Sequence, residues 1–399
     1  MPNQWKKGCL NEMRKMDSYQ SLLTDLSQVN TPSFVVDKES LKQNLALIDT
    51  IKKRTGCKIL LALKAFAMFK VFPLLSKSLD GVCASSQDEA RLGREEFQKE
   101  VHAYAPAFSE LEFKSIVHFS DHIVFNSFNQ WKKFRPMALE APHRISCGIR
   151  VNPEHSEGTI SQYDPCAEGS RLGVRIQNFE ENEIQEISGL HFHTLCEHNS
   201  DALQRTVAAF EKSFGKYLYA LSWLNLGGGH HITKKGYDID LLCHLIDNIK
   251  NTYQVEIYLE PGESIVLNAG YLVASVLDII NCDIPTAILD TSAAAHMPDV
   301  IEVPYKPQII GSDDRGRKPY SYRLGGVSCL ASDILGEYSF DNPIKIGDKL
   351  IFTDMAHYTM VKANTFNGIR LPSIFLYDAL TRNLELVRNF YYDDYKSRL

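Results

Sequence analysis

A lysine ends one of the most apolar segments of the chain. Residues 59–63 read Ile-Leu-Leu-Ala-Leu and are followed directly by Lys64. Such a run is typical of a strand that is buried on both faces, as in a parallel sheet. A lysine that is desolvated there loses its proton readily and can form a Schiff base with a carbonyl compound. Taken alone, Lys64 is better interpreted as a structural residue whose ammonium reaches water. A catalytic role for Lys64 therefore needs support from other residues of the chain.

Further residues that could do chemistry also follow apolar runs. They are His193, the consecutive Gly227, Gly228 and Gly229, and Glu260 and Gly262 of a Glu-Pro-Gly segment. Three glycines in a row let the backbone approach an anion and turn N–H groups toward it, although a flexible turn is an equal alternative. A glutamate that ends a buried strand needs a cationic or hydrogen-bonding partner.

Together these residues match the needs of one cofactor. Pyridoxal phosphate requires a lysine for its aldehyde, an anion site for its phosphate, a carboxylate at its pyridine nitrogen and a flat group against its ring. Lys64, Gly227–Gly229, Glu260 and His193 would fill these roles in that order. A glutamate at the ring nitrogen keeps it protonated, so that the ring accepts electrons from a developing carbanion. We therefore predict pyridoxal 5'-phosphate as the cofactor.

The elements that must position these residues repeat along the first two thirds of the chain. Candidate strands at 33–36, 59–63, 81–83, 101–104, 123–125, 145–151, 186–192, 223–226 and 256–259 alternate with amphipathic helical patterns. This alternation predicts a parallel sheet, and eight or nine repeats over roughly 230 residues fit a (β/α)8 TIM-type barrel of the α/β class. In such barrels the chemistry lies at the carboxyl ends of the strands, where the residues named above would sit.

The pattern changes after about residue 266. The runs 269–280, 286–289, 320–324, 349–352 and 373–377 are short and extended, with Gly, Pro and Asp between them, which predicts a mostly β domain. We therefore expect residues 34–266 to form the cofactor-binding barrel. Residues 1–33 and 267–399 are expected to form a β-rich domain that contributes to the active site.

Composition limits the classes of function. The chain has 399 residues, a net charge of -6 and 44% hydrophobic residues, which argues against nucleic-acid binding and favours a cationic ligand. No apolar stretch approaches the ~20 residues that span a bilayer, and no signal-peptide core is present. A cytoplasmic protein without membrane contact is expected. Nine cysteines without CxxC pairs suggest neither a disulfide framework nor a metal site.

In combination the motifs resemble those of the fold-type III pyridoxal-phosphate decarboxylases, which include the ornithine and diaminopimelate enzymes. The likeness runs from about residue 31 to 375 and is carried by Ala62-Leu63-Lys64, His191-Phe192-His193, Gly227-Gly228-Gly229, Glu260-Pro261-Gly262, Gly326-Val327-Ser328-Cys329, Asp354-Met355-Ala356-His357-Tyr358-Thr359 and Thr365-Phe366-Asn367-Gly368. The resemblance implies a barrel followed by a β domain, and a head-to-tail homodimer with shared active sites.

The resemblance also implies roles for residues of the second domain. Cys329 would enter the partner's active site and control proton transfer at the carbon that loses CO₂. Without the resemblance, Cys329 would be interpreted as a small buried apolar residue. Tyr358 is similar to a tyrosine that bonds the cofactor phosphate. Asp333 and Asp290 match acidic positions that lie near the distal end of the substrate.

Departures from the family pattern narrow the subgroup. Glu263 stands where an arginine usually helps to hold the phosphate, and Cys196 stands where a serine is usual, so glycine N–H groups and Tyr358 would carry more of the phosphate binding. These features look most like the carboxynorspermidine (carboxyspermidine) decarboxylases, a polyamine-pathway branch of the family. The substrate is then a small cationic, carboxylated polyamine that could pair with Asp290, Glu302 and Asp333. For Glu302 a surface carboxylate is the simpler interpretation.

Three alternatives stay open. A diaminopimelate decarboxylase would need an arginine near residues 290–302, where none occurs. An enzyme like alanine racemase would need a tyrosine base where Cys329 stands. A non-catalytic regulatory homologue is disfavoured because Lys64, Glu260 and Cys329 are all present.

Overall fold

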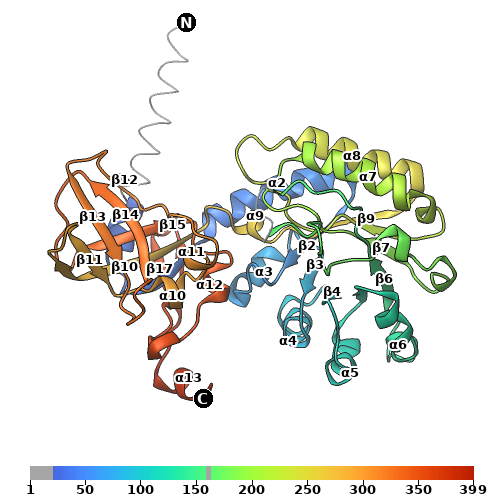
Figure 1. Cartoon of the computed structure of the whole chain (residues 1–399), viewed down its shortest axis with the longest axis horizontal. Coiled ribbons are helices and arrows are strands. Elements are labelled where there is room, and N and C mark those ends of the chain that lie inside the picture. Colours follow the sequence, from blue (N-terminus) through green and yellow to red (C-terminus); the bar gives the residue numbers. More distant parts are fainter. Residues whose placement is uncertain (1–20, 159–162) are drawn as a thin grey trace, which may run out of the picture. The chain divides into compact units, whose positions relative to one another are not determined.

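The computed structural model describes residues 21–158 and 163–399, which divide into two compact units (Figure 1). One unit comprises residues 42–267. The other combines the described residues up to 41 with residues 268–399. Residues 1–20, which were expected in the β-rich domain, lie outside the described part. Among the described residues, no helix combines the length and apolar character needed to span a membrane.

In the described part of the first unit, eight parallel strands close into a barrel, so the predicted fold class is confirmed. The strands are β2 (Lys58–Ala62), β3 (Gly81–Ala84), β4 (Glu100–Tyr104), β5 (His122–Phe125), β6 (Ser146–Arg150), β7 (Gly189–His191), β8 (Trp223–Asn225) and β9 (Glu256–Leu259). Each strand pairs with the next, and β9 pairs with β2. Because all strands run in one direction, their carboxyl ends meet at one mouth of the barrel.

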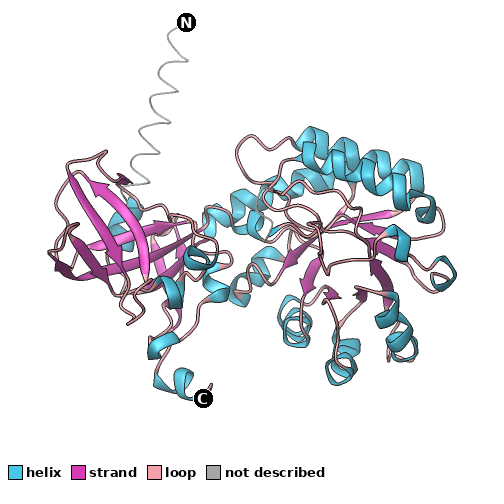
Figure 2. Ribbon diagram, in the orientation of Figure 1, coloured by secondary structure: helices cyan, strands magenta, loops and turns pink. Residues whose placement is uncertain are grey.

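Helices surround the barrel strands (Figure 2). They are α2 (Lys38–Thr55), α3 (Phe72–Leu75), α4 (Gln87–Leu92), α5 (Glu110–Phe119), α6 (Phe128–Leu139), α7 (Ser200–Leu218), α8 (Ile239–Tyr253) and α9 (Glu263–Val266). Local sequence explains their starts and orientation. Ser109 and Glu112 form a reciprocal capping box at the start of α5, which satisfies free N–H groups of its first turn. In α7, Leu203, Val207 and Phe210 recur at helical spacing and are buried.

The amino-terminal end of the barrel is filled by a large side chain. Trp223 begins β8, is buried, and donates from Nε1 to Oγ of Ser146 at 2.8 Å. Gly148 and Gly189 leave the room that its ring needs, since a Cβ at Gly189 would lie 2.0 Å from the indole. This end is therefore packed core, which leaves the opposite end for a ligand.

In the described part of the second unit, nine strands form one sheet in the order β12-β14-β13-β11-β10-β1-β16-β17, with β15 on β10. Their bounds are β1 (Ser33–Asp37), β10 (Gly270–Ile280), β11 (Thr286–Leu289), β12 (Ser312–Asp314), β13 (Tyr320–Gly325), β14 (Ile334–Phe340), β15 (Lys349–Thr353), β16 (Ser373–Asp378) and β17 (Asn383–Arg388). Short helices α10 (Ala293–His296), α11 (Asp299–Glu302), α12 (Thr359–Lys362) and α13 (Tyr392–Lys396) accompany the sheet. The mostly β character that was predicted here is confirmed.

The strand predicted at 33–36 exists but does not belong to the barrel. As β1, its residues 33–36 pair antiparallel with residues 270–273 of β10. On its other side, residues 33–37 pair parallel with residues 373–377 of β16. All five residues of β1 are buried. An apolar run buried on both faces looks the same in a barrel and in the centre of a covered sheet, so its partners could not be predicted from the run itself.

Candidate active site

The carboxyl ends of four barrel strands bring the predicted cofactor residues to one end of the barrel. Lys64 follows β2, His193 follows β7, the glycine turn of Gly227–Gly229 follows β8, and Glu260 follows β9. Backbone hydrogen bonds continue beyond the strands and hold these segments together. The N–H of Glu260 donates to the carbonyl of Gly227 at 2.8 Å, and the N–H of Ala62 donates to that of Pro261 at 3.2 Å.

Glu260 is held by two side chains from neighbouring strand ends. Asn225 donates from Nδ2 to its Oε1 at 2.7 Å, and Nε2 of His191 lies 3.2 Å from its Oε2. Because a carboxylate only accepts, His191 must donate from Nε2. Burial alone would raise the pKa of Glu260, but His191, followed by His102 and Asn225, outweighs burial and lowers that pKa to about 2. The side chain is 13% exposed, and it stays ionised at neutral pH.

His193 is fixed as a neutral, flat ring. Its Nδ1 accepts a hydrogen bond from the N–H of Gly228 at 2.9 Å. Burial, followed by the charges of Lys64 and Arg150, holds the pKa of His193 well below its usual range. The imidazole therefore carries no charge at neutral pH, which suits a ring that lies against an aromatic ligand.

The glycine turn has no room for side chains. A Cβ at Gly227, Gly228 or Gly229 would lie 2.0–2.5 Å from a carbonyl oxygen of a neighbouring strand end, and Gly227 and Gly229 also have positive φ values of 69° and 82°. The N–H groups of Gly227 and Gly228 already donate to Oδ1 of Asn225 and to His193. Among the described residues, no acceptor is found for the N–H of Gly229. The residues present thus fit an anion, with Gly229 as its donor.

Gly262 has a packing role next to this turn. A Cβ there would lie 2.5 Å from Cβ of Ala65 and 3.0 Å from Cβ of Ala62. The segment after β9 can therefore approach the segment that carries Lys64 only because residue 262 lacks a side chain.

Lys64 is exposed, which differs from the desolvated lysine that the apolar run suggested. The reason is that β2 ends at Ala62 and residues 63–65 turn, so the side chain leaves the strand direction. Its charge still acts within the mouth of the barrel, where it lowers the pKa of His193 and opposes the upward effect of burial on the pKa of Glu89.

Sequence reasoning missed Arg150, which ends β6. It is 4% exposed, donates from Nη2 to the carbonyl of His193 at 3.1 Å, and lies over the ring of Tyr104 at 4.7 Å. Among the described residues it forms no ion pair with a carboxylate. A buried cation of this kind suits an anionic ligand group. The signal that could have identified Arg150 was its position near the end of the predicted strand 145–151. The same kind of signal was available for His191 and Asn225, which lie near the ends of the predicted strands 186–192 and 223–226.

The other predicted site residues lie in the sheet unit. Cys329 is exposed in the loop after β13, and its N–H donates to Oδ1 of Asn367 at 2.9 Å. Tyr358 has φ 40° and ψ −56° and is the centre of a γ-turn that the N–H of Thr359 closes onto the carbonyl of His357. Turns of this kind are rare and strained, and such strain gathers at functional sites.

Asp333 is buried and fully occupied by its own chain. Its carboxylate accepts from Oγ of Ser292 at 2.8 Å, from the N–H of Ala293 at 2.6 Å and from both Oγ and N–H of Ser328 at 2.5 and 3.1 Å. These bonds tie the Cys329 loop to the start of α10. The structure therefore favours a structural role for Asp333 over the substrate contact that was expected.

The remaining two acids are also engaged. Glu302 is 55% exposed and forms an ion pair with Lys362, which also pairs with Asp299; the surface interpretation fits it better than substrate binding. Asp290 is partly buried, and its Oδ1 accepts from the N–H of Ser275 at 2.8 Å. Burial raises the pKa of Asp290 despite hydrogen bonds from Thr31 and Ser275.

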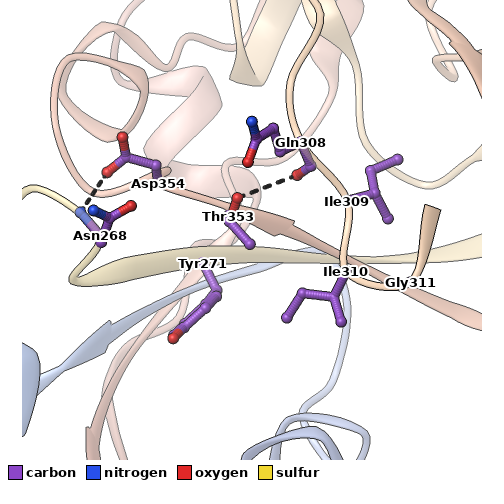
Figure 3. A pocket seen from close by; sticks show the side chains of 8 residues that line it. All are labelled: Asn268, Tyr271, Gln308, Ile309, Ile310, Gly311, Thr353 and Asp354. Atoms are coloured by element: carbon purple, nitrogen blue, oxygen red, sulfur yellow. Dashed lines mark hydrogen bonds between the residues drawn. The ribbon is translucent and has the colours of Figure 1, made fainter. Parts of the chain in front are cut away.

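A cavity of about 310 Å³ lies elsewhere, on the sheet unit (Figure 3). Eight residues line it, namely Asn268, Tyr271, Gln308, Ile309, Ile310, Gly311, Thr353 and Asp354. Two of its contacts are hydrogen bonds, from the N–H of Asn268 to Asp354 at 2.7 Å and from Oγ1 of Thr353 to the carbonyl of Gln308 at 3.5 Å. None of the predicted site residues lines it, so this cavity does not mark the candidate active site.

Comparisons with known proteins agree with this geometry. The family model described as pyridoxal-dependent decarboxylase, C-terminal sheet domain, matches residues 33–356. The chain is 42% identical to the carboxynorspermidine/carboxyspermidine decarboxylase of Campylobacter jejuni, over 93% of this chain and 99% of the relative. It is 43% identical to the carboxyaminopropylagmatine decarboxylase of a Synechocystis species, over 94% of this chain and 96% of the relative.

Solved structures give the same grouping. The crystal structure of carboxynorspermidine decarboxylase from Campylobacter jejuni, complexed with norspermidine, has a TM-score of 0.87 and 42% identity, and covers 93% of this chain and 100% of its own. The diaminopimelate decarboxylase of Helicobacter pylori, complexed with L-lysine, has a TM-score of 0.78 over 96% of this chain and 100% of its own. At 18% identity the latter shows a shared fold only.

Proposed function

The chain belongs to the pyridoxal-dependent decarboxylases with a C-terminal sheet domain, and we propose that it converts carboxynorspermidine or carboxyspermidine to norspermidine or spermidine in polyamine biosynthesis. The observation that carries the chemistry is the meeting of Lys64, His193, the glycine turn and Glu260 at one end of the barrel. The substrate class is supported by relatives of 42% and 37% identity that are named for these two substrates and match nearly the full chain.

Pyridoxal phosphate is the cofactor of this proposal. Lys64 would hold its aldehyde, Glu260 its pyridine nitrogen and the N–H of Gly229 its phosphate, with the ring of His193 against it. When bound, the cofactor supplies a protonated ring that takes up the electron pair left by the departing CO₂. Arg150 offers a buried positive charge for an anionic group of the cofactor or the substrate.

The residues of the chain prepare this chemistry before any ligand arrives. His191 and Asn225 keep Glu260 ionised, so a negative charge is available for a protonated nitrogen at neutral pH. The bond from Gly228 fixes the plane of the His193 ring. Cys329 would act as the general acid that protonates the carbon after CO₂ leaves, and we place it in the site of a partner subunit of a homodimer. Its exposed loop position supports this assignment.

Release of CO₂ from four substrates tests the proposal. Purified protein with added pyridoxal phosphate is assayed with carboxynorspermidine, carboxyspermidine, carboxyaminopropylagmatine and meso-diaminopimelate. We expect the two carboxylated triamines to give the highest kcat/KM. We expect them to differ by no more than about 10–200-fold, because one methylene contributes about 1–3 kcal/mol to discrimination.

A second candidate follows from the relative that is named for carboxyaminopropylagmatine. That substrate is expected to end in a guanidinium rather than an amine, and guanidinium prefers planar bidentate partners. A higher kcat/KM for it than for both triamines would move the assignment to this second candidate. Turnover of diaminopimelate alone would contradict both.

A further inference from the structure

Three ligand-type side chains meet beside the glycine turn and are not used by the proposed function. Glu197, His231 and Glu263 each offer one donor atom, and these atoms all lie within 4.8 Å of one another. All three belong to the barrel unit. They come from three different segments, which follow β7, β8 and β9. The sequence predicted no metal site, because residues so far apart in the chain show no ligand spacing.

Backbone hydrogen bonds fix how these segments meet. The N–H of His198 donates to the carbonyl of Gly229 at 3.0 Å, and the N–H of His231 donates to the carbonyl of His198 at 3.1 Å. Glu197 therefore lies alongside the segment that carries His231. Glu263 begins α9 directly after Gly262, whose lack of a side chain allows close packing against Ala62 and Ala65. The cluster rests on the same backbone contacts as the glycine turn.

His231 gives the second observation, which is independent of the carboxylates. It is only 5% exposed, and neither of its ring nitrogens has a hydrogen-bond partner within the described residues. Its Nε2 nevertheless lies 3.3 Å from Oε1 of Glu263, without the alignment of a hydrogen bond. Two ligands at about 2.0–2.2 Å from one ion are themselves about 3 Å apart, so this separation is compatible with a shared metal ion as well as with an ion pair.

The surroundings provide space for water molecules. A cavity of about 190 Å³ is lined by Glu197 and His231 and also by Asn199, Lys234, Lys235, Gly236 and Tyr237. Lys234 and Lys235 are exposed, so their ammonium groups can extend into solvent. The cavity leaves room for water molecules to complete the coordination of an ion that has only three protein ligands.

A comparable cluster at the other end of the barrel already contains a cation of the chain. Glu100, His102 and His122 also offer donor atoms within 4.8 Å of one another. There the ammonium of Lys58 already forms an ion pair with Glu100, and the hydroxyl of Tyr258 donates to the same carboxylate at 3.3 Å. A positive charge of the chain itself occupies the place that an ion would take.

We propose that Glu197, His231 and Glu263 form a binding site for one divalent first-row metal ion such as Mn²⁺. Two carboxylates and one imidazole, with water in the remaining positions, are ligands that suit Mn²⁺. The site is distinct from the residues assigned to the cofactor, and the proposal does not depend on which substrate is decarboxylated.

Titration with Mn²⁺ tests this site on the full-length protein. Protein freed of metal with a chelator is titrated with MnCl₂, and free Mn²⁺ is read from its electron paramagnetic resonance signal. Mn²⁺ is chosen because it favours oxygen ligands such as carboxylates and water, whereas the free cysteines of the chain would complicate Zn²⁺. We expect one ion per chain. Glu197→Gln and Glu263→Gln should each weaken binding at least about tenfold.

Two further measurements make the result decisive. Glu197 is exposed, so Glu197→Gln should fold normally, and Mn²⁺ should raise the thermal midpoint of this variant by less than that of the wild type. Glu140→Gln changes an exposed glutamate at the end of α6 and should bind Mn²⁺ like the wild type. Absence of saturable binding would overturn the proposal, and so would binding that survives both Glu197→Gln and Glu263→Gln.

Discussion

At the scale of single residues, Glu260 shows how the barrel prepares its chemistry. Its carboxylate would be costly in a buried position without partners. His191 and Asn225 end the two preceding strands and stand next to each other in the ladder, so both reach it. The charge that the proposed cofactor needs is therefore in place before binding, and no rearrangement of the site is required to create it.

The role of Lys64 can be tested by absorption. Lys64→Ala removes the only group assigned to the cofactor aldehyde, so protein mixed with pyridoxal phosphate should lose the visible band of lysine-bound cofactor. Lys77→Ala, at another exposed lysine of the barrel unit, should keep that band. An unchanged spectrum of Lys64→Ala would reject the assignment.

The ionisation of Glu260 predicts a pH dependence of stability. Its pKa is about 2 in the folded chain and about 4.3 in an unfolded chain. As the pH falls, the unfolded state therefore takes up the proton first. The stabilisation by ionised Glu260 is fully present above about pH 5 and is lost progressively between about pH 5 and pH 2.

Urea unfolding of the cofactor-free protein at several pH values measures this effect. The free energy of unfolding of the barrel unit should differ between wild type and Glu260→Gln by about 2–3 kcal/mol at pH 7. The difference should shrink toward pH 3. Glu140→Gln serves as an exposed control with a small effect at every pH. A difference for Glu260→Gln that does not change with pH would contradict the explanation.

The sequence allowed part of this site to be predicted. Lys64, His193, the glycine turn and Glu260 could be placed because each follows an apolar run, and parallel strands bring such positions together. Arg150, which occupies a similar strand end, was missed because an apolar run does not indicate which of the polar residues next to it will face the mouth of the barrel. The structural bonds of Asp333 could not be predicted, because the donors that occupy it, such as Ser292 and Ser328, come from separate segments.

At the scale of elements, the spacing of the barrel strands at their amino-terminal end depends on small residues that leave room for large ones. Trp223 of β8 packs against Gly189 of β7, where a Cβ would lie 2.0 Å from the indole ring. The strands cannot separate to make room without losing their ladder bonds. The fit between these two residues therefore sets the spacing of the neighbouring strands.

Gly189→Ala should destabilise the barrel by about 3 kcal/mol or more, because overpacking at a rigid site forces the strands apart. The midpoint of urea unfolding measures the loss. Trp223→Phe removes part of the ring that the new methyl group meets, so the double variant should be more stable than the sum of the two single effects predicts. Additive effects would show that the two residues do not compete for space.

For the strand β1, its existence could be predicted from the sequence but its partner strands could not. Its existence followed from a short apolar run, but its membership of the sheet depends on β10 and β16, which lie far away in the chain. The strands β12, β14 and β17 were not predicted. Most residues of β12 and β17 are exposed or half-buried, and the apolar residues of β14 are interrupted by Gly336, Glu337 and Ser339. Runs with a strong apolar pattern, such as β10 and β11, were found.

At the scale of the whole molecule, the proposed sharing of active sites between two subunits has a quantitative consequence. Lys64→Ala and Cys329→Ala would each impair both sites of a homodimer. In a mixture of the two variants, half of the randomly assembled dimers contain one chain of each kind. Each such dimer has one site with both native residues, so the mixture should recover about a quarter of wild-type activity.

Mixing the two inactive variants after unfolding and refolding them together measures this recovery as CO₂ release. A mixture of Lys64→Ala with His193→Ala is the matched control and should recover nothing, since both changes lie in the barrel unit. If each site were built from one chain only, the first mixture would also stay inactive.

The position of β1 also bears on how the chain folds as it is synthesised. This strand is made early, yet its two neighbours begin only at Gly270 and Ser373. The segment 42–267 is complete before either neighbour leaves the ribosome. Until β10 is translated, both edges of β1 therefore remain open to pairing with other chains, and the edge that pairs with β16 stays open until residues 373–378 follow. A product that ends before Ser373 would contain a finished barrel and a sheet that lacks only β16 and β17, with one edge of β1 left unpaired.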